Sequence, residues 1–164
     1  MRKIYLLIAI CFLLIGCTNE PKYEKRAIEQ TPQEIAYYEN LIKGKSPSEV
    51  AKLSVEDVAK RLGGTKVRTK IDGFVTFEEI FAENENVIFN YSLSSAYANL
   101  SMKDREKFMT FAEKDLVSRV CSLQTARNSL KHGQREVHRY FYEYPQSPVF
   151  ELKVDEQICV KAGL

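Results

Sequence analysis

The sequence is poor in the residues and motifs that carry catalytic chemistry. It has two histidines, His132 and His138, and four cysteines in 164 residues. It contains no HExxH zinc motif, no GxSxG nucleophile turn and no glycine-rich phosphate loop. We therefore predict that the protein is not an enzyme, with no catalytic residue, no metal ligand and no cofactor.

Acidic pairs are the remaining candidates for acid–base chemistry. Glu78 and Glu79 are adjacent, and Glu83 and Glu85 lie close by. Neighbouring residues of a strand point to opposite faces of a sheet, so we expect Glu78 and Glu79 to point apart. We interpret all four as solvated side chains of strand edges and turns.

Long apolar runs are also scarce, and the one present lies at the N-terminus. Residues 4–15 are apolar and follow Arg2 and Lys3, the arrangement of a secretory signal. The run is shorter than the about 20 apolar residues of a membrane-spanning helix. It ends in Leu14-Ile15-Gly16-Cys17, which resembles the lipobox of bacterial lipoproteins.

The lipobox resemblance implies removal of residues 1–16 and lipidation of Cys17. Each buried CH₂ contributes about 0.8 kcal/mol, so several acyl chains on one residue anchor firmly. Thr18 follows the cysteine, where an inner-membrane retention signal has Asp. We therefore expect an outer-membrane lipoprotein that faces the periplasm. The alternative is an ordinary secretory signal with an unmodified cysteine.

The mature chain has no net charge. Arg2 and Lys3 are two of the 24 basic residues, so 22 remain against 22 acidic ones. Such a chain has no general attraction to nucleic acid. Residues 17–33 are polar and without periodicity, which predicts a lipidated tether. Residues 34–164 then form a single domain.

Two cysteines, Cys121 and Cys159, remain in this domain. In an exported protein, such an even pair favours a disulfide over two free thiols. They are 38 positions apart, and a loop of that length is stabilised by roughly 4 kcal/mol in the chain-entropy model. Metal binding is the rival interpretation, but it needs more ligands than two distant cysteines.

Periodicity and caps predict an α+β domain. We expect helices over residues 34–43, 47–62 and 101–121, with helical structure continuing to Gly133. Ser46 and Ser101 are the expected N-caps, and Ser54 is a candidate restart within the second helix. The expected strands are 74–82 and 86–94, joined by a turn at Glu83–Asn86, then 136–144 and 149–154. Residues 66–72 are a further candidate strand. We therefore predict an antiparallel sheet of about four strands packed against helices.

The strand over 136–144 carries the aromatic segment HRYFYEYP. Tyrosine is enriched at interfaces because it combines apolar area with a polar tip. Tyr140, Tyr142 and Tyr144 are therefore a candidate partner surface, with Phe141 directed inward. An aromatic strand packed as core is the alternative.

The C-terminal part resembles the β-type pilotins of type II secretion. The shared layout is a helix cysteine at Cys121, Gly133 twelve positions later, an aromatic strand, a last strand and Cys159. The resemblance implies a bridge from the helix to the end of the last strand. It also implies a lipid-anchored periplasmic domain that binds a secretin and carries it to the outer membrane. Residues 18–64 are longer and more helical than that pattern requires.

Two functions remain open. The first is a pilotin-like factor that binds another envelope protein, with a secretin as the candidate, in a groove between the helices of residues 101–132 and the sheet. The second is a protective lipoprotein, such as a hydrolase inhibitor, an immunity protein or an exclusion factor. It would use the loops ENEN or YPQSP. The third alternative is a structural lipoprotein that has no single binding partner.

Overall fold

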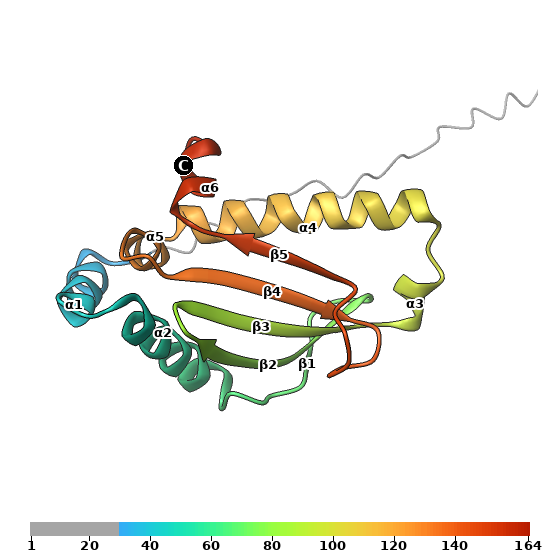
Figure 1. The fold of residues 1–164 in the computed structure, drawn as a ribbon, viewed down its shortest axis with the longest axis horizontal. Helices are drawn as coiled ribbons and strands as arrows, with labels where there is room; N and C mark the ends of the chain where they lie inside the picture. The colour runs from blue at the N-terminus through green and yellow to red at the C-terminus, as the bar shows by residue number, and fades with distance from the viewer. Residues whose placement is uncertain (1–29) are drawn as a thin grey trace, which may run out of the picture.

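A computed structural model describes residues 30–164, and it is an α+β domain with a five-stranded sheet (Figure 1). The helices are α1 Pro32–Ile42, α2 Pro47–Leu62, α3 Ser95–Ala98, α4 Met102–Ser122, α5 Gln124–Lys131 and α6 Glu156–Lys161. The strands are β1 Thr69–Lys70, β2 Val75–Glu83, β3 Asn86–Leu93, β4 Arg135–Phe141 and β5 Phe150–Val154. Within this range no helix has both the length and the apolar character needed to cross a bilayer.

The sheet is mixed, so the prediction of about four antiparallel strands is wrong. Its order is β1-β2-β3-β4-β5, and β3 pairs with β4 in parallel. The other three pairs are antiparallel. Helices α3, α4 and α5 carry the chain from the end of β3 back to its start, and such a crossover makes two neighbouring strands parallel. The fifth strand, β1, comes from the candidate segment at residues 66–72.

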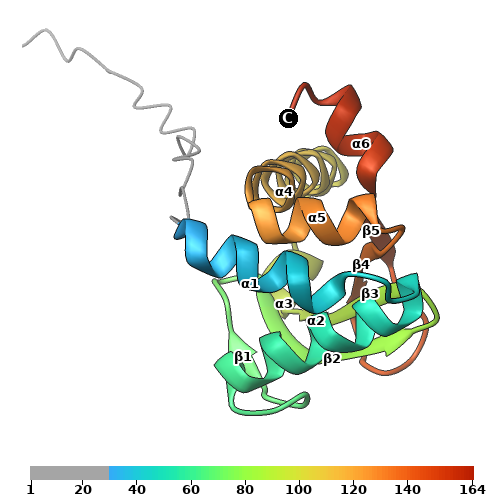
Figure 2. The same ribbon diagram turned by 90° about the vertical axis from the view of Figure 1, so that its left-hand side faces the viewer.

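All three apolar clusters lie on one face of the sheet. Val87, Phe89 and Tyr91 of β3 point to this face, where Ala51 and Val55 of α2 pack. Leu116 and Val120 of α4 cover Val154 of β5 on the same face. Figure 1 shows α4 running alongside β5, and Figure 2 shows α2 lying across β2. The opposite face of the sheet is polar at many positions.

The predicted helix caps are confirmed. Ser46 caps α2 in a capping box with Glu49, and Ser101 caps α4 through the amide of Asp104. Such caps satisfy amides that have no partner within the helix. Ser54 does not restart a helix, since α2 is continuous. An unpredicted box at Thr31 begins α1 at Pro32.

Two short helices were not predicted. Helix α3 has only four residues, and α6 follows β5 in a stretch for which no helix or strand was predicted. Asp155 caps α6 by accepting from the amide of Ile158. In the sequence, Asp155 followed by Glu156 is typical of a helix N-terminus. The helix is only six residues long, however, which is too short to show a helical spacing of apolar residues. Strand β4 also ends at Phe141, earlier than predicted.

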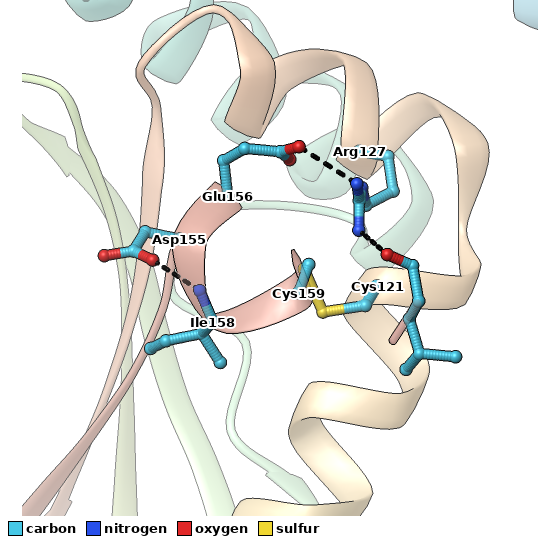
Figure 3. The surroundings of a disulfide bond; sticks show 7 residues. Cys121, Arg127, Asp155, Glu156, Ile158 and Cys159 are labelled. Atoms are coloured by element: carbon cyan, nitrogen blue, oxygen red, sulfur yellow. Dashed lines mark hydrogen bonds and ion pairs between the residues drawn. A yellow bond between two sulfur atoms is a disulfide. The ribbon is translucent and has the colours of Figure 1, made fainter. Parts of the chain in front are cut away.

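The predicted disulfide is confirmed, with a different partner element. Cys121 of α4 and Cys159 are bonded at 2.03 Å, and both are buried. Cys159 lies within α6 and not at the end of the last strand. Arg127 of α5 reinforces the same corner, because it pairs with Glu156 at 3.0 Å and donates to the carbonyl of Leu164 (Figure 3).

We expect the double variant Cys121→Ala/Cys159→Ala to lose stability. Opening this loop returns entropy to the unfolded chain, so the free energy of unfolding should fall by about 2–5 kcal/mol. Urea denaturation measures the loss. Dithiothreitol should lower wild-type stability to a similar extent and leave the double variant unchanged. Equal melting temperatures for oxidised and reduced wild-type protein would contradict the prediction.

Candidate functional site

The side chains that could catalyse a reaction or bind a metal do not form one cluster in the described residues. Among residues 30–164, no group of three or more His, Cys, Asp or Glu side chains is arranged to hold a metal ion. His132 is exposed after α5, whereas His138 is only 3% exposed in β4. Of the two histidines, only His138 is buried among core residues.

His138 lies in a stack of rings on the helix-covered face of the sheet. Its ring is parallel to those of Phe89 at 4.5 Å and Tyr91 at 5.6 Å. Its Nδ1 is 3.0 Å from the Tyr91 hydroxyl and its Nε2 is 3.4 Å from Glu136. A carboxylate only accepts, so Nε2–H donates to Glu136 and Nδ1 accepts from Tyr91.

Burial keeps this imidazole neutral. It lowers the pKa of His138, and the hydrogen bond and charge of Glu136 oppose that shift only in part. Burial also raises the pKa of Tyr140, to about 12. With so little exposed surface, His138 cannot reach a substrate proton. It is a structural member of the core.

The same stack corrects the candidate tyrosine surface. Tyr140 lies 5.0 Å from Tyr91 and 4.3 Å from Phe150, and it is 8% exposed. Tyr142 is 40% exposed. Tyr144 lies beyond the strand, where its hydroxyl donates to Glu79. Because β4 ends at Phe141, the three tyrosines do not form one stripe, and Tyr140 belongs to the core.

The expectation that Glu78 and Glu79 point apart is wrong. A β-bulge interrupts the register between Phe77 and Glu79, and the extra residue lets both carboxylates reach the polar face. Glu78 accepts from Ser92 at 2.6 Å. Glu79 accepts from Asn90 at 3.1 Å. Both glutamates are largely buried.

Each carboxylate nevertheless has a cation partner. Lys66 lies 3.4 Å from Glu79, and Arg68 lies 3.3 Å from Glu78. Burial alone would raise the pKa of Glu79, but the bonds from Tyr144, Lys66 and Asn90 outweigh it and lower that pKa. An ionised, fully bonded carboxylate is a poor general acid. Glu79 holds Tyr144, and with it the start of the β4–β5 loop, against the sheet.

Four exposed apolar side chains belong to segments at the end of the sheet where β3 and β4 finish. We call Ile71, Met102, Tyr142 and Val149 the end patch; they are 59%, 78%, 40% and 43% exposed. The ring of Phe108 lies behind this patch, 5.9 Å from Phe74 and 5.0 Å from Tyr97. Figure 1 shows this end beside α3, with α1 at the far end of the molecule. Contiguous exposed apolar patches mark protein-binding surfaces, which makes this end of the sheet a candidate.

Aromatic rings occupy the space expected to be a groove. Phe108 of α4 lies 6.5 Å from Phe150 of the sheet, so the helix packs directly on β5 at this point. The structure instead has a cleft of about 700 Å³ between α1 and α2. Its walls combine apolar and charged side chains, including Tyr37, Tyr38, Leu41, Leu53, Lys60 and Arg61.

Comparison with known proteins places the fold. No protein-family model and no curated protein sequence matches the chain. A crystal structure of a protein of Pseudomonas aeruginosa described as secreted is similar at a TM-score of 0.52 and 19% identity. That match covers 69% of this chain and 96% of the other. EpsS, the pilotin of the Vibrio vulnificus type 2 secretion system, is similar at a TM-score of 0.50 and 13% identity. That match covers 76% of this chain and 96% of EpsS. The chain therefore has a pilotin-like fold.

We expect acid to destabilise the protein through His138. Its pKa is lower in the fold than in the unfolded chain, so below about pH 6.5 the unfolded state binds more protons. The free energy of unfolding should therefore fall between pH 7.5 and 5.5, by up to about 1.4 kcal/mol per pH unit.

Urea denaturation at each pH measures this slope. The variant His138→Gln should flatten it, whereas the matched variant His132→Gln should keep it because His132 is exposed. An unchanged slope in His138→Gln would show that other groups are responsible.

Proposed function

We propose that this protein is a lipid-anchored envelope protein that acts by binding another protein, as a pilotin-like factor in the assembly of a secretion channel. The likeness of its fold to the pilotin EpsS carries the proposal. Its role is therefore protein transport and not catalysis. The burial of His138 and the ion pairs of Glu78 and Glu79 support this reading, since neither offers a reactive group to a substrate.

The proposal assigns three parts to the chain. Residues 1–16 are the signal, residues 17–33 the lipidated tether and residues 34–164 the periplasmic domain. Cys17 and most of the tether lie outside the described residues. Gln30 and Thr31, at the end of the predicted tether, already make contacts of the folded domain. The buried Cys121–Cys159 bond supports an oxidising compartment.

The end patch is the proposed partner surface. Its four side chains are apolar and solvent-exposed, and the ring of Tyr142 lies 6.1 Å from that of Tyr97, which packs on Phe108 and Phe150. Burying such groups against a partner gains about 25 cal/mol per Å² of apolar surface. Of these four residues, Tyr142 is the one that the sequence analysis had also named as a candidate partner-binding residue.

We expect the variant Cys17→Ser to lose its membrane anchor. The proposed anchor is the set of acyl chains on Cys17, so without them the protein should move from the outer-membrane fraction to the soluble periplasmic fraction. Membrane fractionation and the mass of the N-terminal peptide measure the two effects. An unmodified Cys17 in the wild-type protein would overturn the anchor and leave the fold assignment intact.

We expect a photo-crosslinking residue at Met102 or Tyr142 to capture a channel-forming envelope protein in cells. The matched control is the same residue at Val160, which is 63% exposed on α6, outside the end patch. Mass spectrometry identifies the captured protein.

Capture of a secretin from the end patch, and not from Val160, would support the proposal. Capture of a soluble hydrolase or toxin would instead favour the protective lipoprotein. Equal capture from all three positions would show that the end patch is not a specific surface.

A further inference from the structure

Helix α1 is attached to the domain by several side-chain hydrogen bonds and by a narrow apolar face on which Ile35 and Leu41 are only half-buried. Its only fully buried residue is Ile42, at its last position. Ahead of Ile42, the side chains that bond to α5 are Gln30, Tyr38 and Glu39. Their partners on α5 are Thr125, Ser129 and Asn128, which share one face of that helix. Segments held by hydrogen bonds with little apolar burial open at low free-energy cost.

Tyr38 is the central contact of this interface. Its hydroxyl lies 2.8 Å from Ser129 of α5 and 3.0 Å from Ser54 of α2. Ser54 in turn donates to Gln134 at 2.6 Å. Ser54 gives its one proton to Gln134, so Tyr38 donates to Ser54. The Ser129 hydroxyl is shared between Tyr38, at 2.8 Å, and the carbonyl of Thr125, at 3.2 Å. One side chain of α1 thus connects α2, α5 and the start of β4.

Gln30 supplies the missing cap of α5. The N-cap residue of that helix, Leu123, has no side chain able to accept from its first amides. Gln30 Oε1 accepts from the amide of Thr125 at 3.1 Å, and its Nε2 donates to the Thr125 hydroxyl at 2.8 Å. A distant residue therefore satisfies an amide that a local cap would otherwise satisfy. When Gln30 leaves, the first turn of α5 loses its cap.

We propose that α1 is a latch that opens as a unit while the sheet stays folded. Gln30 and Tyr38 hold it closed, and Ile42 with the turn at Gly44 forms the hinge. Gly44 has a φ of +74°, a conformation that glycine adopts readily. Opening uncaps α5 and enlarges the existing cleft between α1 and α2.

Native-state hydrogen exchange on the purified full chain tests the latch. In the variant Gln30→Ala/Tyr38→Phe, amides of α1 should exchange about tenfold faster, the effect of losing roughly 1.4 kcal/mol of hydrogen bonding. Amides of β3 and β4 should keep their wild-type rates. The matched control is Tyr37→Phe, an adjacent tyrosine that is 69% exposed, which should leave α1 unchanged.

Three results would overturn the latch. The first is that the double variant leaves α1 exchange unchanged. The second is that Tyr37→Phe accelerates exchange as much as the double variant does. The third is that wild-type α1 amides exchange only through global unfolding, at the rate of β3 and at every urea concentration. The measurement needs no partner, so it stands or fails independently of the proposed function.

Discussion

The stacked rings that cross β3, β4 and β5 are the interaction on which the rest of the structure depends. Phe89, His138, Tyr91, Tyr140 and Phe150 form one continuous row, with α2 packed at its Phe89 end and α4 at its Phe150 end. The parallel pairing of β3 and β4 brings the first four together, and the antiparallel pairing of β5 adds the last. The row therefore joins the part of the core under α2 to the part under α4, and at its far end Phe150 contacts Tyr97 of α3 and Phe108 of α4.

Local signals in the sequence predicted the elements well. The caps at Ser46 and Ser101, the β2–β3 hairpin and the Cys121–Cys159 bond all follow from a few neighbouring residues or from cysteine number. In the hairpin, Asn84 has a φ of +54°, which asparagine tolerates better than most residues. Such features depend on short-range chemistry that a single sequence displays directly.

What the sequence could not predict depends on contacts between distant segments. Alternation along the strand does not reveal the bulge that brings Glu78 and Glu79 to one face, because a bulge is a property of two paired strands. The aromatic content of β4 did not distinguish core from surface, since that depends on which helix covers Tyr140. The cap of α5 was equally hidden, because Gln30 is 95 positions away from Thr125.

The disulfide divides the chain into two mechanically different parts. The covalent loop between Cys121 and Cys159 encloses α5, β4 and β5. A force applied from the N-terminal side can straighten α1, α2, β2 and β3 in turn, but it cannot lengthen the chain through that loop. The extension available to the protein under load is therefore shortened by the 38 residues of the loop. Strand β4 remains joined to β5 and α6 in a closed ring from which the rest of the sheet can be rebuilt.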